Sequence, residues 1–557
     1  VGSETINGIQ PVATTEFSNN VISNWAQTKA GYGSDGQLSN NNFIGNYYIN
    51  NKNPHPTTNL FRGDVGTSMY ATGNFYGEAS TDGTITGAHV ITNNGSYFGG
   101  GTTFVNQPFD ISGTSPDTRE TADVALERVQ DYSGSNWQNR SPIDQYIIGN
   151  IGNSAANQIN DLTGSPQASQ WTTLMAQRPD ANGNAPFTRA ANYDTDKDGM
   201  PDVWETAHGL NPNSATGSNG NNGTVMNDGY TNLEAYINEV GAFPAPSTLV
   251  FNNANGTGRF AEIGNWGNIW KPSRFDMAQV NAGTVAVDVV GQHARNLTIA
   301  NSSGNTATLA VTGGWIDVAE KLAIGPGGTG AVNQSSGIVR AGASVTIGGA
   351  NNAGTYNLSG GTLATALLTK GAMGGNFNFT GGTLHADQVN FSLTNSGGIL
   401  APGSDVALQN IAAASMPDIN DQVETVLSFV GNTRVAGNLT MQTGKLQIDL
   451  ASLTSFDTIT VDNLLSLGGM LEVVLDNGYE PTAGSSWKIG TAAGITGNFM
   501  STSSGFTTQV SGGNLFLQFA TVPEPSTLVL AALGIAGFLA THRLRQKSSR
   551  DSTMTKV

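Results

Sequence analysis

Acidic residues recur at short intervals over twelve positions in the middle of the chain. They are Asp194, Asp196, Asp198, Asp202 and Glu205, at positions 1, 3, 5, 9 and 12 of a loop. A Ca²⁺ ion takes about six to eight oxygen ligands, which alternate acidic residues can supply around one point. Gly199 permits the sharp turn at position 6, Met200 offers its backbone carbonyl oxygen, and Glu205 would bind with both carboxylate oxygens. The stretch therefore predicts a Ca²⁺ site.

This ligand spacing is that of an EF-hand loop. The alternative is a solvated acidic turn before a helix, because Asp202 and Glu205 would also stabilise a helix N-terminus. That alternative leaves the three crowded aspartates unexplained. In exported modules a calcium site usually stabilises the fold, so the loop alone does not indicate catalysis.

A second half of the same module follows in residues 227–236. Aligning Gly229 with position 6 places five residues at the ligand positions, namely Thr224, Met226, Asp228, Asn232 and Ala235. Met226 and Ala235 lack the side-chain oxygen that their positions need. We expect the second site to be weak or empty, with its helix contributing packing only.

The elements that must position this loop belong to a chain with few charges. Of 557 residues only 12% are charged, against about 25% in an average soluble domain, and 72 are glycine. The polar surface must come from Asn, Ser, Thr and Gly, which favours short strands and turns over charged helices. The absence of cysteine excludes disulfides, thiolate zinc sites and a cysteine nucleophile.

The charge balance also excludes a nucleic-acid partner. The formal net charge is −17, and Lys and Arg cluster only near the C-terminus. The six histidines are scattered singly, without metal-ligand or catalytic-triad spacing. The chain starts at Val1 without the features of a secretory leader, so we expect either a removed leader or missing upstream sequence.

Two regions repeat with periods in the twenties. In residues 1–115, Asn followed by two bulky residues recurs at Asn20, Asn46 and Asn74, at intervals of 26 and 28. In residues 247–431, the last glycine of each repeat lies at 314, 337, 361 and 382, at steps of 23, 24 and 21. Such periods predict stacked rungs of a parallel β-helix or β-solenoid.

Other segments break these repeats. Residues 116–189 predict a helical or irregular cap, with helices over 121–129 and 143–151. Residues 190–243 hold the calcium module, and 244–246 read Pro-Ala-Pro, which is typical of a linker. Residues 432–520 alternate polar and apolar positions and predict a capping β-sandwich or final rungs.

The C-terminus carries a tripartite segment in residues 521–547. Val522-Pro523-Glu524-Pro525-Ser526 precedes thirteen apolar or small residues, 528–540, and then a basic cluster that includes Arg543, Arg545 and Lys547. Thirteen residues are short for a bilayer-spanning helix, which needs about 20. The basic cluster would stay on the cytoplasmic side. The alternative is a buried C-terminal helix followed by a disordered tail.

This segment resembles the PEP-CTERM sorting signal of Gram-negative bacteria, on which an exosortase acts during export. The polar tail 548–557 departs from that pattern. The resemblance implies an exported protein of the cell envelope or the extracellular space. It also implies that an exosortase and the membrane are partners, with a C-terminal hydrophobic helix transiently in the inner membrane.

Residues 15–240 are similar to the late rungs and calcium module of bacterial pectate lyases of polysaccharide lyase family 1. The similarity lies in residues 19–25, 31–33 and 45–48, in the helix 121–129, and in residues 194–205, 208–212 and 228–234. It implies a right-handed parallel β-helix, an acidic polysaccharide as partner, and Ca²⁺-assisted β-elimination on polyuronates.

In that family the catalytic acids and arginine precede the segment matched by residues 19–25. Only eighteen residues precede it here, and their charged members are Glu4 and Glu16. We therefore expect a C-terminal part of a lyase without its catalytic residues. Arg62 and Lys52 are candidate contacts to an acidic polysaccharide, or simply solvated loop cations.

The sequence thus predicts a mainly β fold. It would combine parallel β-helix or β-solenoid segments with a small helical, EF-hand-like calcium module and a C-terminal hydrophobic helix. Two functions stay open. One is an exported polysaccharide lyase of pectate-lyase type, and the other is a non-catalytic cell-surface protein that binds polysaccharide or has a structural role.

Overall fold

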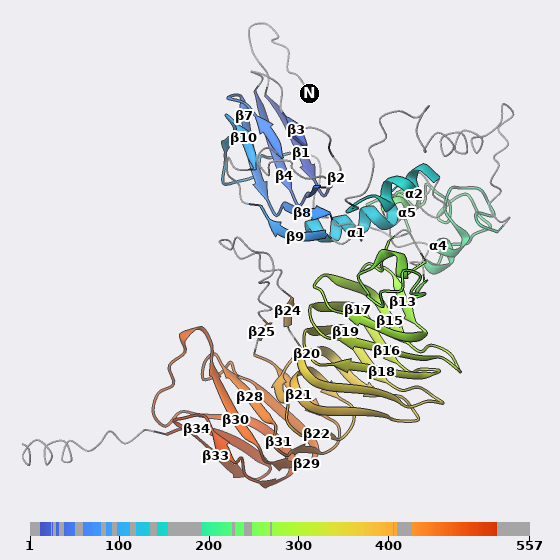
Figure 1. The fold of residues 1–557 in the computed structure, drawn as a ribbon. Helices are drawn as coiled ribbons and strands as arrows, with labels where there is room; N and C mark the ends of the chain where they lie inside the picture. Colours follow the sequence, from blue (N-terminus) through green and yellow to red (C-terminus); the bar gives the residue numbers. More distant parts are fainter. Residues whose placement is uncertain are drawn as a thin grey trace, which may run out of the picture. The chain divides into compact units, whose positions relative to one another are not determined.

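The computed structural model describes most of the chain in two compact units. The described residues are 12–23, 25, 29–32, 38–50, 60–79, 85–91, 97–111, 119–133, 142–153, 192–225, 229–238, 248–267, 270–404, 406–408, 426–428 and 430–520. One unit comprises residues 1–382 and 406–428, and the other comprises 383–405 and 429–557. Strands dominate both units, and helices are few (Figure 1).

The first part of the chain forms a parallel β-helix, here called the first solenoid. One sheet contains β1 (Ala13–Ser18), β4 (Ser39–Ile44), β7 (Thr67–Thr72) and β11 (Thr103–Phe104). A second contains β2 (Val21–Ser23), β5 (Tyr47–Asn50), β8 (Phe75–Ala79) and the antiparallel β9 (Ile85–Val90). The third contains β3 (Gly31–Tyr32), β6 (Phe61–Gly63) and β10 (Phe98–Gly100). The predicted stacked rungs are confirmed.

The predicted asparagine repeat forms a hydrogen-bonded ladder between these rungs. The backbone N–H and side-chain amide of Asn20 both donate to Asn46 Oδ1, at 3.0 and 3.1 Å. Asn46 repeats the pattern toward Asn74 Oδ1, at 3.0 and 2.9 Å. Asn46 and Asn74 are fully buried. A buried amide must be hydrogen-bonded, so identical residues at the rung period satisfy one another.

Among the described residues, four helices follow. They are α1 (Ala122–Tyr132), α2 (Pro142–Gly149), α4 (Asp202–Ala207) and α5 (Asn232–Asn238). The first two confirm the helices predicted over 121–129 and 143–151. Ala122 and Leu126 of α1 pack with Tyr47 and Ile49 of β5 and with Ile148 of α2, so one helix face is apolar and buried.

The same unit continues with a second solenoid of parallel strands. Its strands are β12 (Thr248–Val250), β13 (Met277–Val280), β14 (Ala282–Val287), β15 (Gln292–Ile299), β16 (Thr306–Val311), β17 (Trp315–Ile324), β18 (Thr329–Gln334), β19 (Ile338–Ile347), β20 (Gly354–Lys370) and the start of β21 (Gly375–Val389). A short 3₁₀ turn spans Ile263–Asn265. β17 pairs with β19, and β19 with β20, so Ile316, Val339 and Leu363 stack in register inside the core.

The predicted glycine period reflects close packing of successive turns. Gly314, Gly337, Gly361 and Gly382 all have positive φ, between 60° and 71°. A Cβ on Gly337 would lie 2.5 Å from the carbonyl oxygen of Gly314, and a Cβ on Gly361 would lie 2.2 Å from that of Gly337. Only glycine fits both the conformation and the contact.

The other compact unit contains further rungs. After the end of β21 come β22 (Leu393–Asn395), β23 (Ile399–Pro402), β26 (Asn432–Val435), β27 (Leu439–Met441), β28 (Lys445–Leu450), β29 (Thr458–Leu467), β30 (Met470–Leu475), a 3₁₀ turn (Asp476–Gly478), β31 (Ser486–Gly497) and β32 (Ser501–Thr502). The antiparallel hairpin β33 (Phe506–Ser511) and β34 (Asn514–Phe519) pairs with β31. Of the two predicted alternatives for residues 432–520, a capping β-sandwich or final rungs, the parallel pairing favours final rungs.

The first unit also includes a short antiparallel pair, β24 (Val406–Leu408) and β25 (Val426–Ser428).

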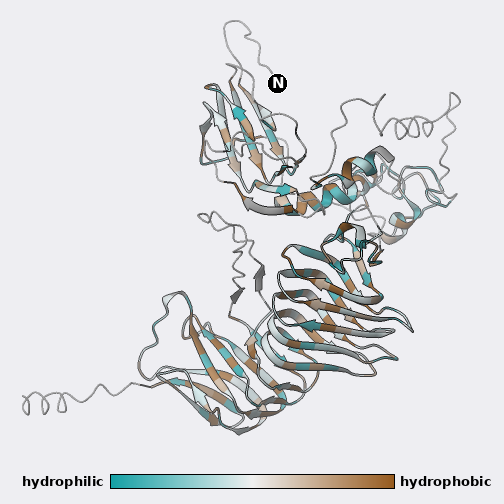
Figure 2. Ribbon diagram, viewed as in Figure 1, coloured by the Kyte–Doolittle hydropathy of each residue, from teal (hydrophilic) through white to brown (hydrophobic). Residues whose placement is uncertain are grey.

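Hydropathy alternates along the solenoid strands (Figure 2). In β18, for example, buried positions alternate with exposed or half-buried ones from Thr329 to Gln334. No helix in the described part of the chain has the length and hydropathy needed to span a bilayer. The C-terminal hydrophobic helix expected in 521–547, the polar tail 548–557 and Lys52 lie outside the described residues.

Candidate metal centre

The predicted calcium loop leads into α4 and shares a small core with α5. That core contains Met200, Trp204, Leu210 and Ala235, all buried. Trp204 stacks on His208 with ring centroids 4.2 Å apart, and its indole meets the Tyr236 ring edge-on at 5.5 Å. Ala235 lies on α5, so the second half of the module contributes packing, as predicted.

Three aspartates converge at the start of the loop. Carboxylate oxygens of Asp194, Asp196 and Asp198 lie within 4.8 Å of one another. The backbone curls around them, because Asp198 N–H and Gly199 N–H donate to the two oxygens of Asp194, at 3.2 and 3.1 Å. Gly199 has φ of 100°, which suits the turn predicted at position 6.

Glu205 is the residue of the loop that points most clearly to a cation site. Its side chain is fully buried, and neither carboxylate oxygen has a hydrogen-bond partner among the described residues. Oδ2 of Asp196 and Oδ2 of Asp198 are buried and unpartnered in the same way. Burial, then the charges of Asp196, Asp198 and Asp202, raise the pKa of Glu205 to about 7. Buried carboxylates without partners are costly, and a bound cation would remove that cost.

Burial also raises the pKa of the Asp198 carboxyl, and the neighbouring charges of Asp196 and Asp194 act in the same direction. The carbonyl of Asp198 is held by the side-chain amide of Asn221 at 3.2 Å. The loop therefore concentrates negative charge at a point that the rest of the module keeps in place.

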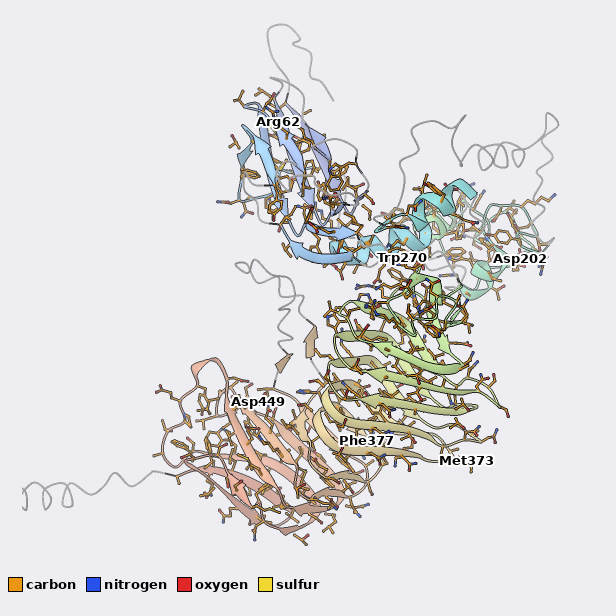
Figure 3. The ribbon with its side chains drawn as sticks, viewed as in Figure 1. Arg62, Asp202, Trp270, Met373, Phe377 and Asp449 are labelled. Atoms are coloured by element: carbon orange, nitrogen blue, oxygen red, sulfur yellow. The ribbon has the colours of Figure 1, made fainter. Side chains whose placement is uncertain are left out.

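The structure uses Asp202 differently from the other predicted ligands. Asp202 (labelled in Figure 3) begins α4. Its two oxygens accept hydrogen bonds from Thr195, from the N–H at 2.7 Å and from Oγ1 at 2.5 Å. In twelve-residue calcium loops, position 9 often acts through a water molecule. Thr195 is not acidic, so the spacing of acidic residues gave no indication that it would hydrogen-bond to Asp202.

Met200 serves the module in two ways. Its side chain is fully buried in the shared core, and its N–H donates to Asp198 Oδ1 at 3.0 Å. These contacts fix the backbone at the position whose carbonyl oxygen is the predicted ligand. The ligand role itself stays a prediction.

Asn232 holds the second half of the module together. Its side-chain amide donates to the carbonyl oxygens of Ser218 and Gly220, both at 2.9 Å, and its Oδ1 accepts from Val225 N–H at 3.0 Å. These bonds engage both ends of the buried side chain. Met226 and Asp228 lie outside the described residues, so the expectation of a weak or empty second site stays a prediction.

Outside this module, Arg62 is the other predicted candidate that the structure describes. It is exposed on β6 of the first solenoid, in register with Tyr32 on β3 (Figure 3). The described histidines do not assemble into a metal-binding group. His385, for example, is buried alone on β21, and burial lowers its pKa to about 4.

Comparison with known proteins agrees with both sequence resemblances. Residues 521–544 match the family model of the PEP-CTERM protein-sorting motif. The chain is 30% identical to probable pectate lyase C of Aspergillus flavus and of Aspergillus oryzae, over 229 residues that make up 40% of this chain and 48% of each relative. The corresponding protein of Neosartorya fischeri is 29% identical over 236 residues, 42% of this chain and 49% of the relative. The chain spans about half the length of the curated relatives it matches. The chain is thus a β-solenoid protein that is similar to these pectate lyases over about 40% of its length and carries a PEP-CTERM sorting motif.

Proposed function

We propose that this protein is exported by an exosortase-dependent route, engages an acidic polysaccharide through its pectate-lyase-like part, and is stabilised by one Ca²⁺ ion in the loop 194–205. The observation that carries the metal proposal is the buried carboxylate of Glu205, whose oxygens have no partner among the described residues. A hydrated acidic turn does not need such a residue.

The ligand set follows from the loop. Asp194, Asp196 and Asp198 would each offer one oxygen, Met200 its carbonyl, Glu205 both oxygens, and Asp202 a contact through water. The span of up to 4.8 Å between aspartate oxygens suits Ca²⁺, whose bonds of about 2.3–2.6 Å place opposite ligands about 5 Å apart. Mg²⁺, with bonds of about 2.0–2.1 Å, needs a tighter cage.

The ion's role in this proposal is to stabilise the fold. Glu205 and Trp204 are neighbours on α4, and Trp204 contacts α5 through Tyr236. A cation that holds Glu205 against the aspartates would therefore fix α4 and, through the shared core, α5. Metal binding to the native state adds directly to its stability.

The polysaccharide part of the proposal is supported by similarity to pectate lyases. We propose polyuronate as the ligand class and, for the whole protein, lyase activity by β-elimination. A non-catalytic binding role is the second candidate, and one feature of the first solenoid favours it. Glu16 is one of the two acids that precede residues 19–25, and its carboxylate on β1 is engaged by Arg119, which donates two hydrogen bonds to it at 2.9 and 2.8 Å. Its pKa is lowered despite its partial burial, because Arg119 stabilises the charged form.

Thermal unfolding of the full chain in a Ca²⁺ titration tests the metal proposal. We expect the melting temperature to rise with Ca²⁺, with a stabilisation of about 2.7 kcal/mol once Ca²⁺ reaches about 100 times Kd. Glu205→Gln should abolish the response. Asp462→Asn, which removes an exposed acid paired with Arg434, is the matched control and should respond as wild type does. An unchanged melting temperature at millimolar Ca²⁺ would rule the site out.

A further inference from the structure

Helix α1 is fixed to the first solenoid on one side. Ala122 and Leu126 pack against Tyr47 and Ile49 of β5. Just before the helix, the side chain of Asn19 accepts from Glu120 N–H at 2.9 Å and donates to the Glu120 carbonyl oxygen at 2.6 Å. These contacts anchor the helix and its entry point.

The opposite side of α1 presents acidic residues at intervals of four. Asp123 and Glu127 both contact Arg274, which lies between β12 and β13 in the first turn of the second solenoid. Arg274 N–H and Nε each donate to Glu127 Oε2 at 2.9 Å, and Nη2 donates to Asp123 Oδ2 at 2.8 Å. One guanidinium group therefore binds two successive turns of the helix.

Two further contacts join α1 to the second solenoid, and all of these contacts together are here called the seam. The Ser273 hydroxyl donates to Asp131 Oδ2, one turn further along α1. His293 Nδ1 from β15 meets Glu127 Oε1, and the imidazole also packs edge-on against Trp315 at 5.1 Å. The seam thus uses three acids of one helix and three polar residues of the second solenoid.

The centre of the seam is shielded from water. Glu127 and His293 are 9% and 6% exposed. Burial by itself would raise the pKa of Glu127, but His293 and Arg274 hold it at about 2. Aromatic contacts flank the ion pairs, since the Arg128 guanidinium lies 4.6 Å above the Phe275 ring and Tyr132 meets that ring edge-on.

We propose that these groups form an ionic latch that couples the first solenoid to the second independently of the chain that connects them. The latch comprises Asp123, Glu127 and Asp131 of α1 together with Ser273, Arg274 and His293. Its contacts join residues 142 to 166 positions apart, and the acidic loop 194–205 lies between the two sides of each contact. The latch therefore holds α1 and the first turn of the second solenoid together whether or not the loop binds a metal ion.

Arg274 is the residue on which the latch depends. Removing one member of a buried ion pair leaves the other charge unpaired, and here two carboxylates would lose the same partner. Removing Arg340 offers a contrast. Its side chain is 42% exposed and pairs with Asp317 of the neighbouring turn at 3.3 Å, outside the latch.

Cleavage of the connecting chain tests the proposal. A protease recognition sequence is inserted between residues 154 and 191 of the full chain, and after complete cleavage the two parts are analysed by size-exclusion chromatography. We expect the cleaved wild-type parts to co-elute at micromolar concentration, with Ca²⁺ and with a chelator. Arg274→Met should weaken their association by at least about 100-fold, the effect of an unpaired buried charge. Arg340→Met should co-elute as wild type does.

Glu127→Gln is the second variant, because it keeps the shape of the side chain and removes its charge. It should weaken the association in the same direction, and circular dichroism before cleavage checks that each variant is folded. Separation of the cleaved wild-type parts would overturn the latch. Equal association in the Arg274 and Arg340 variants would overturn it as well. Separation only after chelation would show that coupling depends on the metal loop and would overturn the claimed independence.

Discussion

Replacing Gly337 by alanine should destabilise the second solenoid through contact between successive turns. Gly337 has φ of 69°, and an added Cβ would lie 2.5 Å from the Gly314 carbonyl oxygen and 2.8 Å from that of Gly313. The left-handed conformation costs a non-glycine residue about 1–2 kcal/mol. Forcing extra atoms into a packed site costs about 1–3 kcal/mol more. We therefore expect a loss of about 2–5 kcal/mol in the free energy of unfolding.

Gly304→Ala is the matched control for this substitution. Gly304 has φ of 85°, but an added Cβ there meets nothing within 4 Å. The control carries the conformational cost and the same change in unfolded-chain entropy, without the clash. Urea unfolding followed by circular dichroism should place Gly337→Ala about 1–3 kcal/mol below Gly304→Ala, with similar m values. Equal destabilisation of the two variants would refute the idea that the glycine period arises from rung packing.

The remaining predictions concern the asparagine ladder, a buried acid pair and the polysaccharide. Asn46→Ala should lower the free energy of unfolding by about 2–3 kcal/mol, because it removes the side-chain donor to the Phe17 carbonyl oxygen and the acceptor of the Asn20 backbone N–H. Asn333→Ala on the exposed face of β18 should cost under about 0.5 kcal/mol in the same urea assay. Burial and, after it, the charges of Asp449 and Asp476 raise the pKa of Asp457 to about 8. The protonated carboxyl therefore contributes its full share of stability below about pH 4, and this contribution is lost as the pH rises through 8. Asp449→Asn should reduce the loss of unfolding free energy between pH 5 and pH 8, and an unchanged loss would contradict this. Incubating the chain with polygalacturonate should give no unsaturated product by ultraviolet absorbance, and robust turnover would show that residues outside our candidates form an active site.

Both solenoids could be predicted because their signals are local and repeated. Each turn must place the same kind of residue at the same point, so the Asn20, Asn46 and Asn74 ladder and the glycines at 337 and 361 leave a period in the chain. The convergence of Asp194, Asp196 and Asp198 was predictable for a related reason. Residues two positions apart in a tight loop are brought together by the covalent backbone itself.

Burial and the choice of partners depended on contacts between distant segments. Spacing placed Glu205 in the ligand set, but only the folded module shows that its carboxylate is buried and that neither oxygen has a partner among the described residues. Spacing also placed Asp202 in that set, and the structure adds that its oxygens accept hydrogen bonds from Thr195, while its ligand role stays a prediction. Such side-chain choices follow from the competition between nearby donors, which a pattern of acidic residues does not contain.

The sequence by itself determined the repeating architecture, the acidic loop and the sorting motif, because each is written in residues close together or at a constant period. Only the tertiary structure decided that Arg274 binds α1. That contact joins single residues about 150 positions apart and has no repeat to reveal it. A unique long-range ion pair becomes visible only when the folded chain brings its two members together.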